Sequence, residues 1–471
     1  MVSKPGFLDR TLAHLRSAWR DLGQSSACPT NLRLHEDLPE TDHLCLLEQM
    51  NACLEARGGE VAARAGAARL GNAYMGLNDT GKRQFLLLLA ANFDVSTETI
   101  DAILSRYQQA DPSQRHKIRQ QLREALEPPR CRLLTQFNAL PQGVKFLVDM
   151  RADMHRLGSP ETPLLSDLKH DLKELLTAWF DVGFLKLQQI TWDSPASLLE
   201  KLIEYEAVHE IRNWEDLKHR LTLDRKLFAF FHPNMADEPL IFIQVALVKG
   251  LATDIQTVLD ETQTPLDSEQ ADTAIFYSIS NAQRGLQGIS FGNFLIKRVV
   301  SKLKREHPNL KQFSTLSPIP GFQRWLASTI KSNSFGLISR DEWGVISDLA
   351  PSDKEAPLVY LLAQKGWHLN HSYCHILQPL LERLCTHYLL REKRRGHQAL
   401  DPVAHFHLSN GARIEQLNWL ADRSEKGLKR SAGLMVNYLY DLDQIESNSE
   451  GYSAEGSIST ADSVTTIIAR H

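Results

Sequence analysis

The sequence lacks several features that would assign it to a class at once. It has no long hydrophobic run: the longest, residues 85–91, is far shorter than the about 20 residues that a membrane-spanning helix needs. It has no excess of positive charge, with 53 Lys and Arg against 57 Asp and Glu and a formal net charge of −4. A dedicated nucleic-acid-binding protein normally carries a strongly basic domain. We therefore expect neither a membrane nor a nucleic acid as a partner.

Cysteine is also scarce, and no targeting segment is expected. The N-terminus lacks the apolar core and small-residue cleavage site of a signal peptide. Residues 4–20 are mildly basic, but Asp9 and Asp21 lie within and just after them, so an ordinary first helix is predicted. The C-terminal residues 469–471 carry no peroxisomal address. Thinly scattered cysteines suit reduced thiols, and we expect a cytoplasmic protein. The six are Cys28, Cys45, Cys53, Cys131, Cys374 and Cys385.

What remains is an ordinary globular composition with a helical first part. The 471 residues are 42% hydrophobic and 23% charged, enough for two or three domains. Leu147, Met150, Met154 and Leu157 recur at helical spacing, and residues 83–93 are apolar almost all round. No nucleophiles, bases or metal ligands are grouped here. Residues 1–180 are therefore predicted to form a helical, oligomerising domain.

The pattern changes near residue 181. Residues 227–231, 240–248 and 274–280 read as strands, and the first two adjoin through a short loop, so the sheet should begin antiparallel. We expect an α+β protein with a mixed α/β catalytic domain over residues 181–440. Residues 441–471 are acidic and then Ser/Gly-rich, which predicts a mobile tail.

Residues 274–322 form the central stretch of this second part. A buried strand at 274–280 is followed by a Gly-bearing turn at 283–292, a helix from 293 to about 307, and a second strand at 312–316. Backbone N–H groups in such a turn, together with a helix N-terminus, can hold a phosphate. The turn resembles the pyrophosphate loop Q-x-x-G-x-G/A of GNAT N-acyltransferases through Gln287, Ser290 and Gly292, with Ser in place of the first Gly. A plain strand–helix turn is the alternative.

Two further features suggest chemistry. Ser317 precedes Pro318 and Pro320, whose fixed φ angles favour an extended backbone that points the hydroxyl, although an N-terminal helix cap or a turn serine is the more common role of such a residue. His405 and His407 lie in a segment that we expect to be extended, so both should share one face. Either could be a general acid, a ligand or a hydrogen-bonded surface residue.

One cluster resembles a metal site without matching one. It contains no C-x-x-C or H-E-x-x-H signature, so a helix with buried thiols is predicted and no metal is expected. The basic face of the helix at 293–307 is likewise predicted to be solvated. The cluster comprises His368, His371, Cys374, His375, Cys385 and His387.

Longer motifs resemble the malonyl-CoA decarboxylase family over nearly the whole chain. They include Thr273-Ala274-Ile275-Phe276-Tyr277-Ser278-Ile279-Ser280, Gly285-Leu286-Gln287-Gly288, Leu316-Ser317-Pro318-Ile319-Pro320-Gly321-Phe322, Phe406-His407-Leu408, Met150-Arg151-Ala152-Asp153 and Glu206-Ala207-Val208-His209. The resemblance implies a helical assembly domain followed by a GNAT-like catalytic domain, usually in a homotetramer. It also implies decarboxylation of malonyl-CoA to acetyl-CoA in fatty-acid metabolism, with no cofactor.

The resemblance also implies roles for particular residues. Ser317 would be the proton acceptor and His407 the proton donor, which separates His407 from His405. Lys201 matches a lysine associated with activity, and Asn437 and Tyr440 are expected to line the acyl pocket. An acyl-CoA N-acyltransferase that uses the same loop, or a silent CoA sensor, are the alternatives. The loop that would bind malonyl-CoA consists of Gln287, Gly288, Ile289, Ser290, Phe291, Gly292 and Asn293, with Ser290 standing where an acidic residue is expected.

Overall fold

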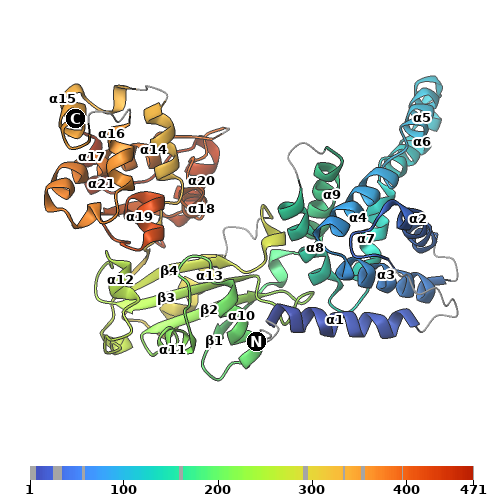
Figure 1. The fold of residues 1–471 in the computed structure, drawn as a ribbon, viewed down its shortest axis with the longest axis horizontal. Helices are drawn as coiled ribbons and strands as arrows, with labels where there is room; N and C mark the ends of the chain where they lie inside the picture. Colours follow the sequence, from blue (N-terminus) through green and yellow to red (C-terminus); the bar gives the residue numbers. More distant parts are fainter. Residues whose placement is uncertain are drawn as a thin grey trace.

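The computed structural model describes residues 7–24, 34–55, 59–158, 163–289, 295–331, 335–351, 356–394 and 396–469. Along the chain, a helical region is followed by a β-sheet and then by a C-terminal group of helices (Figure 1). Within the described ranges, no helix combines the length and the hydrophobicity needed to cross a membrane.

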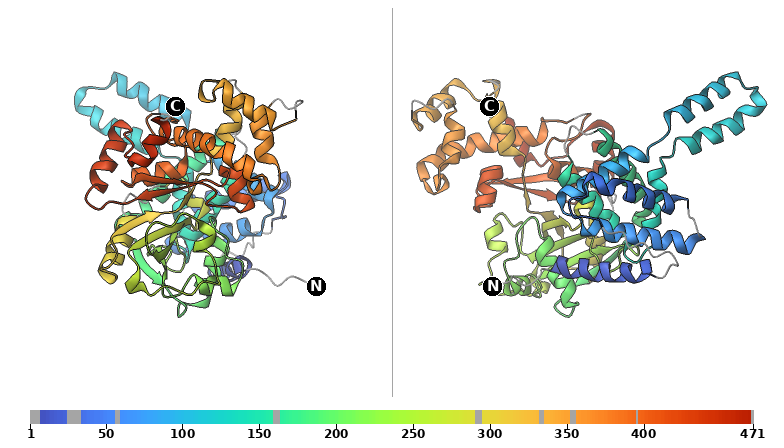
Figure 2. Two further views of the ribbon diagram at one scale, coloured as in Figure 1. Left: turned by 90° about the vertical axis from the view of Figure 1, so that its left-hand side faces the viewer. Right: turned by 45° about the vertical axis from the view of Figure 1, so that its right-hand side comes forward.

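The first region is entirely helical. Helix α9 buries Leu165, Leu168, Leu172 and Leu176, the spacing that gives a helix one apolar face. Helices α5 and α6 form a hairpin that projects away from the rest (Figures 1 and 2). The helices are α1 (Phe7–Gln24), α2 (Glu40–Leu54), α3 (Gly59–Gly76), α4 (Asp79–Asn92), α5 (Thr97–Gln109), α6 (Pro112–Ala125), α7 (Pro129–Asn138), α8 (Gly143–Leu157) and α9 (Pro163–Trp179).

The second region is an eight-stranded mixed sheet in the order β1-β2-β3-β4-β5-β8-β6, with β7 also paired to β8. Strands β1 to β4 are antiparallel, which confirms the pairing predicted for residues 227–231 and 240–248, although β1 itself was not predicted; β4 and β5 are parallel. Helices α10 (Ala196–Tyr205), α11 (Trp214–His219) and α12 (Ile255–Val258) lie between these strands in the chain. The strands are β1 (Lys186–Ile190), β2 (Arg225–Phe231), β3 (Ile241–Val248), β4 (Thr273–Asn281), β5 (Gln312–Thr315), β6 (Ser317–Pro318), β7 (Arg413–Asn418) and β8 (Met435–Leu439).

The pairing of strands β4 and β5 ends before β4 does. A parallel pair needs a crossover, which here runs through the short 3₁₀ helix η3 (Arg284–Leu286) and α13 (Leu295–Glu306). Their paired register ends at Phe276 opposite Thr315, whereas β4 continues to Asn281. The last residues of β4 therefore lack β5 as a neighbour, which leaves room for a cavity at this point of the sheet.

The C-terminal helices form a group of their own above β3 and β4 in the view of Figure 1. They are α14 (Phe322–Lys331), α15 (Arg340–Asp348), α16 (Pro357–Ala363), α17 (His371–Leu390), α18 (Pro402–Ser409), α19 (Glu425–Ser431), α20 (Ile445–Glu455) and α21 (Asp462–Ala469). The α+β class, with a helical region preceding a mixed α/β domain, is confirmed, and so are the strand, helix and strand predicted within residues 274–316.

Two predictions about the C-terminal part are wrong. The segment around His405 and His407 is helical rather than extended, because the Asp401 side chain caps the N-terminus of α18 and Pro402 occupies its first turn. The segment after residue 441 is not a mobile tail in the described range. It forms α20 and α21, which bury Ile445, Tyr452 and Val464 against the core.

Candidate active site

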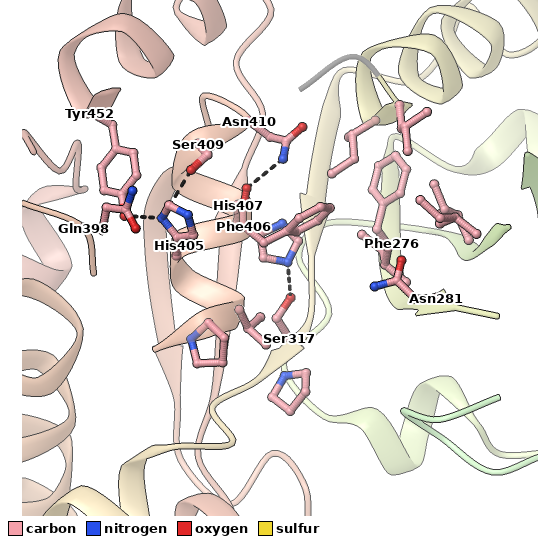
Figure 3. A pocket seen from close by; sticks show the side chains of 18 of the residues that line it. Phe276, Asn281, Ser317, Gln398, His405, Phe406, His407, Ser409, Asn410 and Tyr452 are labelled. Carbon is pink, nitrogen blue, oxygen red and sulfur yellow. Dashed lines mark hydrogen bonds between the residues drawn. The ribbon is translucent and has the colours of Figure 1, made fainter. Parts of the chain in front are cut away.

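A cavity of about 970 Å³ lies where β4 and β5 separate. One wall comes from β4 and the turn after it, and the opposite wall comes from α18 and α20, so segments far apart in sequence meet here (Figure 3). The lining combines apolar side chains, most of them on the β4 side, with numerous polar side chains, most of them on the α18 and α20 side. Lining residues include Phe276, Ile279, Asn281, Gly288, Ile289, Ser317, His405, Phe406, His407, Asn410 and Tyr452.

Ser317 lines this cavity from the short strand β6. Its backbone pairs with Val436 of β8, and Pro318 follows it, so the sheet and the proline together fix the direction of the side chain. The side chain is buried, and its Oγ donates a hydrogen bond to Thr315 Oγ1 at 2.9 Å. The Ser317 hydroxyl therefore has a fixed direction, and the residue is not a helix cap.

His407 reaches Ser317 from α18. Its Nε2 lies 3.1 Å from Ser317 Oγ, although 90 residues separate the two in sequence (Figure 3). Its Nδ1 lies 2.7 Å from the Tyr440 hydroxyl, and the Tyr438 ring stacks on the imidazole with centroids 4.6 Å apart. Both ring nitrogens are thus engaged and the ring plane is fixed.

The surroundings determine the protonation of this pair. Burial lowers the pKa of His407 to about 3, so the imidazole is neutral at neutral pH. Burial also raises the pKa of Tyr440 well above its usual value, so its hydroxyl stays protonated. Among the described residues that hydroxyl has no partner except Nδ1, to which it can donate. Nε2 then carries the ring proton and donates to Ser317, which donates to Thr315.

His405 has a different setting, on the outer part of the same helix. Its Nδ1 lies 2.9 Å from the Tyr452 hydroxyl, which accepts from the backbone N–H of Ala399 at 2.8 Å. In a helix, residues two apart point in different directions, so His405 and His407 do not share a face. His405 lines the cavity but makes no contact with Ser317 among those the structure shows.

The expected substrate loop is only partly described. Gly288, with φ of +77°, and Ile289 line the cavity, and Gln287 is exposed beside them. Glycine suits this position because its backbone is in the left-handed region. Ser290, Phe291, Gly292 and Asn293 lie outside the described residues.

The other expected site residues support the cavity without lining it. Asn437 is buried on β8, where its Nδ2 donates to the carbonyls of Thr315 at 2.7 Å and Ala252 at 3.0 Å. Tyr440 contacts the far side of the His407 ring. Neither side chain is among those that line the cavity: Asn437 is fully buried on β8, and Tyr440, which directly follows β8, is buried against the His407 ring.

Lys201 also lies away from the cavity lining. It is buried on α10, where its Nζ is 2.8 Å from a carboxylate oxygen of Glu238 and donates to the carbonyl of Asp237 at 2.7 Å. It thereby fixes the loop that joins β2 and β3, and this role could not be predicted from the sequence.

The basic helix face and the His/Cys cluster take no part in the cavity. On α13, Lys302 pairs with Glu306 at 2.5 Å, and Arg298 donates to the Leu185 carbonyl at 2.6 Å. Most of the His/Cys cluster lies on α17, and burial raises the pKa of Cys385 well above its usual value. In the part of the chain that the structure describes, no three His, Cys, Asp or Glu side chains are arranged to hold a metal ion.

Sequence reasoning missed Thr315 and Tyr438, which complete the surroundings of Ser317 and His407. Thr315 Oγ1 accepts from Ser317 and from the Tyr438 backbone N–H, at 2.9 and 3.1 Å. Thr315 and Ser317 are two residues apart, as are Tyr438 and Tyr440. That period of two in strand-like segments is the signal that could have indicated them.

Comparisons with known proteins point to one family along most of the chain. A family model described as the malonyl-CoA decarboxylase C-terminal domain matches residues 183–471, and one described as the malonyl-CoA decarboxylase N-terminal domain matches residues 93–180. The chain is 37% identical over 414 residues to the mitochondrial malonyl-CoA decarboxylase of Rattus norvegicus, with 84% of each chain covered. The corresponding protein of Anser anser anser is 36% identical over 413 residues, with 84% of this chain and 82% of that one covered.

Solved structures are similar as well. The crystal structure of malonyl-CoA decarboxylase from Rhodopseudomonas palustris matches with a TM-score of 0.83 and 38% identity, covering 90% of this chain and 99% of that one. That from Agrobacterium vitis matches with a TM-score of 0.80, at the same identity and coverage. Two family models that together span most of the chain, and relatives well above 30% identity, establish the assignment. This chain belongs to the malonyl-CoA decarboxylase family.

Proposed function

We propose that this protein converts malonyl-CoA to acetyl-CoA and CO₂ and that Ser317 and His407 act together in the reaction. Membership of the family supports the reaction. The observation that most supports the pair is the 3.1 Å separation of Ser317 Oγ and His407 Nε2 on the wall of one cavity. A fixed hydroxyl beside an imidazole is suited to holding an acyl group and delivering a proton to it.

The chemistry requires little beyond these groups. The bond between the malonyl carboxylate and C2 breaks, CO₂ leaves, and the electron pair moves into the thioester as an enolate. Carbon C2 then takes up one proton to give acetyl-CoA, so each turnover consumes one proton. The thioester is the electron sink, and the proposal therefore needs no cofactor. A single donor to such an enolate oxygen is typically worth about 3–4 kcal/mol.

We assign His407 as the proton donor and Ser317, which is hydrogen-bonded to it, as the proton acceptor. Because burial keeps His407 neutral in the free protein, the proton that it delivers has to be acquired when the substrate binds. A malonyl carboxylate beside the ring favours the charged imidazolium, since an opposite charge nearby raises the pKa of a histidine. Tyr440 would hold the ring so that Nε2, and not Nδ1, faces the substrate.

The CoA portion is assigned to the loop formed by residues 287–293. Gly288 and Ile289 already line the cavity, and backbone N–H groups in such turns bind phosphates. We further propose a homotetramer assembled through the helical region, in the cytoplasm and in fatty-acid metabolism. Five cysteines among the described residues are free thiols, which suits a reducing compartment. Light scattering and cell fractionation test the assembly and the compartment.

Incubation with malonyl-CoA alone tests the reaction. Without added amine we expect acetyl-CoA and CO₂ in equal amounts, with one proton taken up per turnover in a pH-stat from which the CO₂ is swept as gas, so that its hydration does not return a proton. An N-acyltransferase would form a product only when an amine acceptor is present, and a CoA sensor would bind without turnover. Either result would overturn the proposal.

A further inference from the structure

The helical region touches the turn that leads into the substrate loop. Helix α8 lies on the side of that region that faces the sheet (Figure 1) and packs directly against η3. The contact is very close at Gly285, where a Cβ atom would lie 1.8 Å from the backbone carbonyl oxygen of Val148. Only glycine allows the two backbones to approach in this way.

Arg151 of α8 makes the polar part of this contact. Its Nη1 donates a hydrogen bond to the Gly285 carbonyl, across 134 residues of sequence. The side chain is buried, with the residue 3% exposed, and no carboxylate among the described residues lies within ion-pair distance of it. Its Nε has no partner there either.

A buried, unpaired guanidinium is costly. Removing a cation from water without an ion partner is unfavourable, and an apolar side chain of similar length would fill the same space at less cost. Burial lowers the pKa of Arg151, which reflects the same penalty. The hydrogen bond to Gly285 is the interaction that can explain why an arginine occupies this position.

The same turn is held from its other side. Gln283 Nε2 donates to the Pro239 carbonyl at 3.0 Å, and Pro239 directly follows Glu238, the partner of Lys201. The turn between these two supports leads within three residues to Gly288 and Ile289 at the cavity. A displacement of the Gly285 peptide would therefore be transmitted to the backbone that meets the ligand.

We infer that Arg151 is a positioning residue for the substrate loop: by fixing the Gly285 carbonyl against α8, it sets the backbone at Gly288 and Ile289 for binding the CoA portion of the substrate. The inference rests on the proposed function only in taking this loop as the CoA site. It gives the helical region a direct part in substrate binding, in addition to any part in assembly.

Three variants of the full-length protein test this role. Arg151→Met removes the hydrogen bond and is expected to raise KM for malonyl-CoA roughly tenfold, while kcat changes less than about twofold, since one hydrogen bond is lost away from the reacting atoms. Arg151→Lys, which keeps the charge, should recover part of the loss. Gly285→Ala, which acts from the other side of the contact, should raise KM in the same way. The matched control is Arg156→Gln on the same helix, where the side chain is 48% exposed and KM should not change.

Measuring the Kd for CoA directly tests the role of Arg151 independently of whether the protein decarboxylates malonyl-CoA. Calorimetric titration with CoA should show the Kd rising with KM in Arg151→Met and remaining at the wild-type value in Arg156→Gln. A folded Arg151→Met with wild-type Kd and KM, or one that loses kcat alone, would overturn the inference. If the wild type binds CoA without decarboxylating malonyl-CoA, the proposed function fails, and the Kd values still decide the role of Arg151. Should Arg151→Met not fold, Arg151→Lys and Gly285→Ala decide it.

Discussion

Removing the Tyr440 hydroxyl should slow the reaction without weakening substrate binding in the cavity. In Tyr440→Phe the His407 Nδ1 loses its partner at 2.7 Å, and the nitrogen is left buried. Leaving a buried polar atom unsatisfied costs about 1–3 kcal/mol, and the ring can then adopt the tautomer in which Nε2 carries no proton. A loss of that size in the transition state corresponds to a decrease in kcat of about 5- to 150-fold. KM should change little, because Tyr440 does not line the cavity.

Tyr438 provides the matched control. Its ring stacks on His407, but its buried hydroxyl has no hydrogen-bond partner among the described residues. Tyr438→Phe keeps the stacking and removes only that unsatisfied group, so kcat should stay within about twofold of the wild type. Steady-state decarboxylation of malonyl-CoA by both variants is the assay. A Tyr440→Phe variant with wild-type kcat, or equal losses in the two variants, would refute the assignment of Tyr440 as the group that orients the imidazole.

Three further predictions concern stability. The pKa of His407 is about 3 in the folded protein, below its value of about 6.5 in the unfolded chain. Below about pH 6.5 the unfolded state therefore binds a proton that the folded state does not. The free energy of unfolding then falls by up to about 1.4 kcal/mol for each unit by which the pH is lowered. The Tm of the wild type should thus fall more steeply from pH 7 to 5 than that of His407→Asn, and parallel curves would contradict this. Lys201→Met should cost about 3–5 kcal/mol in urea unfolding by leaving Glu238 unpaired, and adding Glu238→Gln should recover much of it; no recovery would count against the pair. Gly321→Ala, whose Cβ would lie 2.1 Å from the Tyr388 hydroxyl, should lower the free energy of unfolding by about 1–3 kcal/mol, and an unchanged value would show that Tyr388 can move.

Local patterns were enough to predict the elements that frame the cavity. The apolar, β-branched run at β4, the amphipathic spacing of α13 and the short strand β5 are each encoded within a few residues, and the structure contains all three. Their parallel pairing is consistent with the crossover that joins them, whereas no local pattern indicates where β4 and β5 separate.

Features that depend on distant segments were harder to predict. The alternation in His405-Phe406-His407 suggested a strand, but Asp401 and Pro402 start a helix, a signal that could have been recognised. The few apolar residues of α20 are widely spaced, so its burial was not visible from composition. The approach of Ser317 to His407 depends on how β6 and α18 pack around β8, and no spacing within the sequence encodes that distance.

The most direct measurement of the central claim compares single turnovers of malonyl-CoA by the wild type, Ser317→Ala and His407→Asn in D₂O. We expect the wild type to release acetyl-CoA with one deuterium in its methyl group. Both variants should bind malonyl-CoA with a Kd within about threefold of the wild type but react at least about 100-fold more slowly, the usual contribution of a general acid. A folded variant of either residue that reacts at the wild-type rate would contradict the claim that Ser317 and His407 perform the reaction.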